Sequence, residues 1–437
     1  MKFNLLTIQK NRIVFLGLAL ILITLNARAL VSQGTILSTF MTIFSCTYFV
    51  IGNIFLARDT LYGLLRMERL QSSIIMLMLC LVSIAIIRSF MVGTITLAEF
   101  VISIVNYPLV MLFIIGSYLY FYYQNKTKQY LMATFSSLLL YVVANFILHF
   151  IVGGSSQTGY SYTGETVMLS LFGFTTNRVF FPMAPGINSF GSIAGVAFAI
   201  SLMIWFSNLK IRNSLLVAVS LACILLVDAR TALFMSSFAV LLTMLFWRWR
   251  RKAVFIPVLI PFIYLLLPLA NIIIQATPFA DRLLRNSTDA MTLGGRAIIW
   301  MSLLSEVAQF KWVHLIGYGM YGQQTSEISS NYVQIFVDYL TDKPERMSLH
   351  SGYFQNIIDF GYVGLLFIIS VNSLLIRRIT LCTDERSAKV MLCAVLCMLL
   401  IGITEPVPTI YSRELFYVYF MLLVAGLGMK RNKEIEE

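Results

Sequence analysis

The residues best suited to chemistry gather in a mostly polar segment that runs from about residue 277 to residue 353. His350 lies near its end, directly before an apolar run that starts at Phe354, so we expect its imidazole at the boundary between water and membrane. A histidine titrates near neutrality and can act as a general base, worth about 10²–10⁴ in rate. It can equally serve only as a hydrogen-bonding group, and both interpretations stay open. His149 and His314 fit a structural role better, because one lies inside an apolar stretch and the other on a predicted surface helix.

The same segment is rich in arginine, with Arg282, Arg285, Arg296 and Arg346. The planar guanidinium pairs with phosphate or carboxylate through two parallel hydrogen bonds, whereas lysine acts as a hydrated point charge. This bias predicts an anionic, phosphate-bearing ligand. The alternative is that each arginine only reaches toward lipid headgroups.

Arg230 is a second candidate, in the sequence Val227-Asp228-Ala229-Arg230 at a tight connection between two apolar stretches. A charge at the centre of a spanning helix costs about 2.5–3.5 kcal/mol on insertion scales, so charges this close to apolar stretches require a reason. One reason is a structural pair with Asp228. The other is an arginine that faces a cavity where a lipid-linked pyrophosphate would lie.

The elements that must position these residues are membrane helices. The chain has 437 residues, of which 59% are hydrophobic and 12% charged, values that exclude an ordinary soluble domain. We predict an all-α, polytopic membrane protein with about 12 transmembrane helices, since a span needs about 20 apolar residues. The predicted spans are 12–32, 35–57, 71–92, 97–123, 130–152, 186–206, 213–229, 231–247, 253–273, 354–376, 389–403 and 415–429.

The placement of basic residues predicts the orientation. Of the 32 lysines and arginines, 21 fall in one set of loops, which the positive-inside rule places in the cytoplasm together with both termini. The chain is then one integral membrane domain, 1–437, with outward loops at 153–186 and 274–353. The net charge of +12 is a topology signal, and we expect no nucleic-acid partner.

Within the large loop, apolar residues recur at helical spacing from Arg296 to Trp312. This pattern predicts an amphipathic helix on the membrane surface, with Arg296 in a first turn whose free N–H groups favour an anion. The alternative is packing against the membrane domain. The chain lacks a Walker loop and an HExxH motif, and its six cysteines do not form a disulfide or zinc pattern. We therefore expect no metal and no other cofactor.

The motifs, taken in order, resemble those of the O-antigen polymerase/ligase superfamily of bacterial polysaccharide assembly. The resemblance covers about residues 170–376 and rests on Asn177 to Pro182 with Gly186-Ile187-Asn188, Asp228 to Ala232, Gly295-Arg296 with Trp300, Gly317-Tyr318-Gly319, and His350 to Gly364. One departure is Ser351, where an asparagine often follows the histidine in this family.

The resemblance implies a glycosyltransferase of the bacterial inner membrane whose donor is an undecaprenyl-diphosphate-linked oligosaccharide, used at the periplasmic face. Arg230 and Arg296 would bind the diphosphate, and His350 would activate the acceptor hydroxyl. The further substrate-binding candidates are Arg178, Arg346, Trp300, Tyr353 and Asn188. The start Gly295-Arg296 with Trp300, and the long aromatic-rich loop, look more like the polymerase branch of this family. A ligase that transfers the polysaccharide to lipid A core remains the alternative, and a lipid-linked oligosaccharide flippase is disfavoured because the charges lie on one side. Membrane lipid is an expected partner, and binding of a chain-length regulator stays open.

Overall fold

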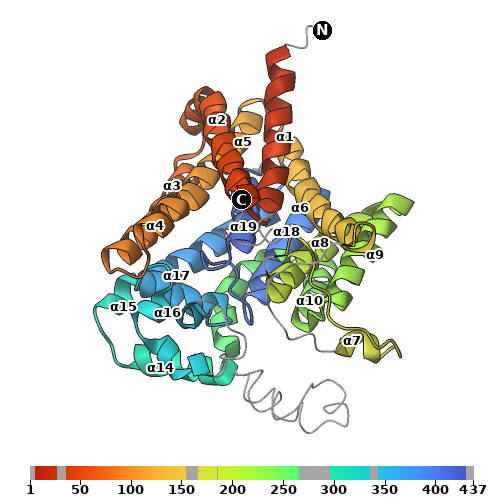
Figure 1. Ribbon diagram of the computed structural model, residues 1–437. Helices are drawn as coiled ribbons and strands as arrows, with labels where there is room; N and C mark the ends of the chain where they lie inside the picture. Colours follow the sequence, from red (N-terminus) through yellow and green to blue (C-terminus); the bar gives the residue numbers. More distant parts are fainter. Residues whose placement is uncertain are drawn as a thin grey trace.

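The computed structural model describes residues 5–26, 36–153, 166–184, 186–264, 296–334 and 343–429, and throughout this part of the chain the elements are helices (Figure 1). The first half holds α1 (Leu5–Asn26), α2 (Ile36–Arg66), α3 (Arg69–Met91), α4 (Leu97–Ile104), η2 (Val105–Leu109), α5 (Val110–Tyr123) and α6 (Thr127–Phe150). The middle holds α7 (Val167–Ser170), α8 (Ile187–Ser207), α9 (Ile211–Leu226), α10 (Arg230–Leu245), η3 (Trp247–Phe255) and α14 (Arg296–Ala308). The last part holds α15 (Val313–Ile316), α16 (Gly322–Thr325), η4 (Ile328–Asn331), η6 (Pro344–Arg346), α17 (Gly352–Thr380), α18 (Glu385–Ile401) and α19 (Arg413–Leu427). The predicted all-α class is confirmed.

Within the described residues, five helical segments are long and apolar enough to cross a membrane: α3, α4 to α5 as one piece, α6, α8 and α17. α9 and α10 are apolar but only 16 residues long. At 1.5 Å per residue such a helix spans about 24 Å, less than the roughly 30 Å of a bilayer core. The predicted span 253–273 extends into residues outside the described part. The total of twelve spans therefore stays a prediction.

α18 and α19 form the centre of the fold and are enclosed by other helices (Figure 1). Every residue from Glu414 to Leu427 is buried, and α19 packs against α5, α6, α17 and α18. A helix that is apolar on all sides belongs in a protein core. Both helices were predicted as ordinary spans because hydropathy alone does not distinguish contact with lipid from contact with protein.

α17 is interrupted by a kink at Gly361, which has a φ of +72° that favours glycine. The kink leaves carbonyl groups without helical partners, and the loop after α15 supplies new ones. The N–H of Tyr318 donates to the carbonyl of Ile358 at 2.7 Å, and the N–H of Gly319 donates to that of Asp359 at 3.0 Å. The motif Gly317-Tyr318-Gly319 thus attaches the polar segment to the broken helix.

The described part of the polar segment opens with α14, whose first described residue is Arg296, and α14 ends at Ala308, four residues earlier than predicted. The chain then turns before α15 begins. One side of α14 carries Ile299, Trp300 and Leu303 and is buried against Phe354 and other residues of the chain, as the packing interpretation requires. The neighbouring positions Met301 and Leu304 are exposed. In Figure 1, α14 to α16 and α7 lie at the lower end of the view.

Candidate functional site

Three charged or ionisable side chains from distant parts of the sequence meet where α14 and α17 begin. Arg296 donates from Nη2 to Oε1 of Glu405 at 2.6 Å, and Nδ1 of His350 lies 4.0 Å from the other oxygen, Oε2. All three side chains are largely enclosed, with exposed fractions of 22% for Arg296, 10% for Glu405 and 18% for His350. A buried acid, base and guanidinium in contact form a candidate reaction centre.

The backbone before His350 is held from both sides. The N–H of Leu349 donates to Oε1 of Gln355 at 3.1 Å, and the carbonyl of Leu349 accepts from Nε1 of Trp300 at 2.9 Å. His350 itself has a φ of +47°, an uncommon value for a residue with a side chain, so the surrounding contacts must impose it. Trp300 thus links α14, and with it Arg296, to the position of His350.

Ser351 caps the helix that follows. Its Oγ accepts from the N–H of Phe354 at 3.2 Å, and it shares a hydrogen bond of 2.6 Å with the hydroxyl of Tyr264. Serine is a favoured N-cap residue because its oxygen satisfies a free N–H of the first turn. The serine that departs from the family pattern therefore makes two hydrogen bonds, one to the helix and one to Tyr264.

The surroundings of His350 favour its neutral form. Burial, together with the positive charge of Arg296, lowers the pKa of His350 from its ordinary value to about 3. Its imidazole is therefore uncharged at neutral pH. Burial raises the pKa of Glu405, and the guanidinium of Arg296 opposes this rise.

Arg230 and Arg178 lie together at the turn between α9 and α10. Arg230 is the first residue of α10, and its Nε lies 4.0 Å from Oδ2 of Asp228, a buried carboxylate that also accepts from the N–H of Met168 at 3.1 Å. Arg178 donates from Nε to the carbonyl of Val227 at 3.0 Å. The structural pair of Asp228 with Arg230, one of the two alternatives, is thus present, and 32% of the Arg230 side chain is exposed.

This turn lies near the end of α18 that leads to Glu405. A Cβ placed on Gly195 of α8 would contact Cβ of Ala232 at 3.2 Å and Cδ1 of Ile401 at 3.5 Å. Ala232 belongs to the first turn of α10, and Ile401 is the last residue of α18. The beginning of α10 and the end of α18 therefore both contact α8 at Gly195.

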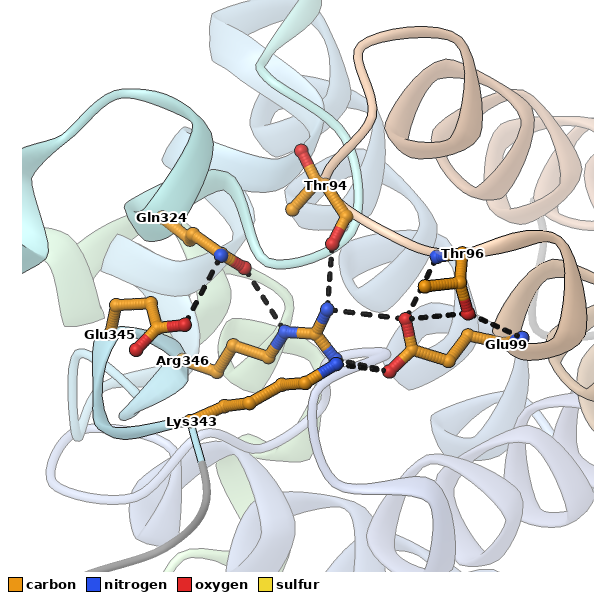
Figure 2. Close-up of polar contacts among 7 residues, drawn as sticks. All are labelled: Thr94, Thr96, Glu99, Gln324, Lys343, Glu345 and Arg346. Atoms are coloured by element: carbon orange, nitrogen blue, oxygen red, sulfur yellow. Dashed lines mark hydrogen bonds and ion pairs between the residues drawn. The ribbon is translucent and has the colours of Figure 1, made fainter.

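Arg346 is bound within a polar network, shown in Figure 2. Its guanidinium donates to Glu99 Oε1 at 2.8 Å, to the carbonyl of Thr94 at 2.6 Å and to Gln324 Oε1 at 3.0 Å, and it lies 4.7 Å from the ring centre of Tyr321. These contacts join the polar segment to the α3–α4 connection. They favour a structural role, and substrate binding by Arg346 stays a prediction.

The remaining candidates lie in different settings. Tyr353 is buried, and its ring centre is 6.3 Å from that of Tyr264, the tyrosine that bonds Ser351. Asn188 is exposed in the first turn of α8. His314 is buried and lies 3.2 Å from Oε1 of Glu306, which fits the predicted structural role. Arg282 and Arg285 lie outside the described residues.

Glu405 is the residue that the sequence analysis missed. It lies 109 positions from Arg296, in a short connection between α18 and α19. The available signal was an acidic residue next to Pro406, enclosed by two strongly apolar stretches, because a carboxylate in such a place needs a cationic partner.

Within the described residues, no three His, Cys, Asp or Glu side chains are grouped to hold a metal ion. No curated protein matches the chain. Residues 215–369 match the family model described as O-antigen ligase, a stretch that contains Arg230, Arg296 and His350. Members of that family are glycosyltransferase-like enzymes of polysaccharide assembly. Together with its long apolar helices, the match identifies an integral bacterial membrane protein. Over residues 215–369 the chain is therefore similar to the O-antigen ligase family, a match that supports the O-antigen polymerase/ligase superfamily.

Proposed function

We propose that this protein is an O-antigen polymerase, a glycosyltransferase that joins undecaprenyl-diphosphate-linked oligosaccharide repeat units at the periplasmic face of the inner membrane. The observation that carries the proposal is the buried contact of Arg296, Glu405 and His350 within or beside the matched segment. Sugar transfer from a lipid diphosphate needs a group that neutralises the leaving diphosphate and a base that takes the proton of the acceptor hydroxyl.

Each need has a candidate group in the structure. The guanidinium of Arg296 supplies positive charge, and Arg230 would supply more from the α9–α10 turn. Charge-assisted hydrogen bonds of about 1.5–3 kcal/mol each allow two arginines to do the work of a divalent cation. His350 is neutral at physiological pH because burial and Arg296 lower its pKa, so a ring nitrogen keeps the lone pair that a base needs. A diphosphate bound to Arg296 would offset one cause of the lowered pKa and make the imidazole a stronger base.

An O-antigen ligase, which transfers the polysaccharide to lipid A core, is the second candidate because the matched family model carries that description. The two reactions share a donor and differ in the acceptor. Surface polysaccharide from a deletion strain separates them. Lipid A core that carries a single repeat indicates a lost polymerase, bare core indicates a lost ligase, and unchanged polysaccharide contradicts both.

The roles of the residues are tested with purified protein, by measuring donor binding and sugar transfer separately. We expect His350→Ala to bind the lipid-linked donor and to transfer sugar about 10²–10⁴ times more slowly. Arg296→Lys keeps the charge but not the two-pronged geometry, so it should lose donor affinity and most activity. His149→Ala is the matched control, since His149 lies on α6, where its ring packs beside those of Phe150 and Phe181. Wild-type transfer by folded His350→Ala and Arg296→Lys would refute the proposed site.

A further inference from the structure

Glu405 stands between the two groups to which the proposed function assigns separate tasks. Its Oε1 accepts from Arg296, and its Oε2 faces Nδ1 of His350. A carboxylate this deeply buried must keep a charged or hydrogen-bonding partner, since losing one leaves an uncompensated buried charge. A ligand that binds Arg296 in place of Glu405 therefore leaves Glu405 in need of another charged or hydrogen-bonding partner.

The backbone that carries Glu405 is firmly placed. The carbonyl of Val407 lies against two glycines, because a Cβ on Gly352 would come within 1.8 Å of its oxygen and one on Gly402 within 2.1 Å. The hydroxyl of Tyr264 donates to the carbonyl of Ile403 at 2.9 Å. The loop is thus fixed against the first turn of α17. Glu405 can change partners by rotating its side chain, without movement of the loop.

We propose that Glu405 is a positioning residue that occupies Arg296 before the donor binds and turns to Nδ1 of His350 when a diphosphate takes over the guanidinium. This inference rests on the proposed function. A diphosphate carries more negative charge than a carboxylate and more oxygens for the guanidinium fork, so it is the stronger partner for Arg296. The released carboxylate then has a donor within reach in the imidazole, whose Nδ1 lies 4.0 Å from Oε2 in this structure.

The change of partner would prepare His350 for its task. When the N–H at Nδ1 donates a hydrogen bond to Glu405, the lone pair on Nε2 is free to face the hydroxyl of the acceptor sugar. In the reaction, the acceptor oxygen forms a bond to the anomeric carbon as its proton passes to Nε2. The bond from the anomeric carbon to the phosphate oxygen breaks, and its electron pair leaves with the diphosphate, held by Arg296. Glu405 stabilises the imidazolium that results.

The test is Glu405→Gln, which keeps the size of the side chain and removes its charge. Donor affinity and turnover should move in opposite directions. Inorganic pyrophosphate and the lipid-linked donor should both bind roughly threefold to tenfold more tightly, because the competitor for Arg296 is weakened. Turnover should fall roughly tenfold to a hundredfold, because the imidazolium loses its counter-charge. Glu405→Asp, which retains the charge at a shorter reach, should lie between Glu405→Gln and the wild type in turnover.

Glu414→Gln is the matched control, since Glu414 is also a buried carboxylate, which accepts from the hydroxyl of Ser412 and interacts with the charge of Arg413. It should leave donor affinity and turnover unchanged in the folded protein. Weaker binding together with lower turnover in Glu405→Gln would show that Glu405 only supports Arg296, and unchanged values would show that it has no role; either result overturns the inference. If Glu405→Gln does not fold, wild-type turnover in Glu405→Asp overturns it. If His350→Ala and Arg296→Lys lose activity while Glu405→Gln behaves like the wild type, this inference alone is refuted. If His350→Ala and Arg296→Lys keep wild-type activity, the proposed function is refuted.

Discussion

Arg346 offers the sharpest test of whether a positive side chain in the polar segment binds substrate or supports the fold. Arg346→Met removes the charge and keeps much of the length, and it deletes the bonds to Glu99, Thr94 and Gln324 and the stacking on Tyr321. The ion pair contributes about 1 kcal/mol, because Glu99 is 31% exposed. The other hydrogen bonds and the cation–π contact bring the expected loss to about 2–3 kcal/mol in the free energy of unfolding.

The assay is a double-mutant cycle with Glu99→Gln, read by thermal unfolding in detergent and by donor binding to the folded protein. With about 2.1 cal/mol/K of unfolding entropy per residue, the loss in Arg346→Met corresponds to a fall of roughly 2–3 °C in Tm. The two changes should couple by about 1 kcal/mol, because each removes the same ion pair. Donor affinity should stay at the wild-type value.

Lys343→Met is the control within the same network. Nζ of Lys343 donates to the same oxygen of Glu99 at 2.7 Å, but its side chain is 43% exposed against 14% for Arg346 (Figure 2). It should therefore change stability by less than about 1 kcal/mol. An Arg346→Met variant of unchanged Tm that binds the donor poorly, beside a harmless Glu99→Gln, would refute the structural assignment and make Arg346 a substrate ligand.

Three further predictions concern the site and the orientation. Since His350 has a pKa of about 3, it stays neutral as pH falls from 7 to 5, so kcat/KM should not decrease around pH 6.5. A decrease there that is also present in Glu405→Gln would mean that His350 titrates as an ordinary histidine. Trp300→Phe removes the buried donor to the carbonyl of Leu349 and should lower the free energy of unfolding by about 1–3 kcal/mol in denaturant titration. An unchanged value would mean that water replaces the indole N–H. In a cysteine-free background, an impermeant maleimide on intact spheroplasts should label Ser330→Cys and spare Thr383→Cys, both exposed positions; the reverse pattern would invert the orientation that the basic residues predict.

Individual residues of the candidate site were predictable from the sequence, but the residues that they contact were not. Arg296 and His350 stood out because each is a polar group beside an apolar run, a pattern readable along the chain. Their common contact is Glu405, and its place beside them depends on how α18 and the following loop pack against the start of α17. No local pattern encodes a contact across 109 positions.

The same limit explains Arg346. Its charge and place in the large loop made it a plausible phosphate ligand, but its carboxylate partner, Glu99, lies 247 positions away in the chain. The all-α class was predictable since apolar composition at this length leaves few alternatives. The helix boundaries were less so: the end of α14 and the enclosed position of α19 depend on tertiary packing, which hydropathy does not contain.

The kink in α17 also sets how much of that helix can lie within lipid. As one straight rod, its 29 residues would extend about 44 Å, well beyond a bilayer core of about 30 Å. The stretch after Gly361, residues 362–380, is about 28 Å long, which matches that thickness without tilt. The nine residues before the kink, Gly352 to Phe360, then lie outside that length, and they follow His350 and Ser351 directly in the chain. A single glycine thereby divides one long helix into a segment of membrane-spanning length and a shorter segment next to His350, which on the proposed function would face the lipid-linked donor.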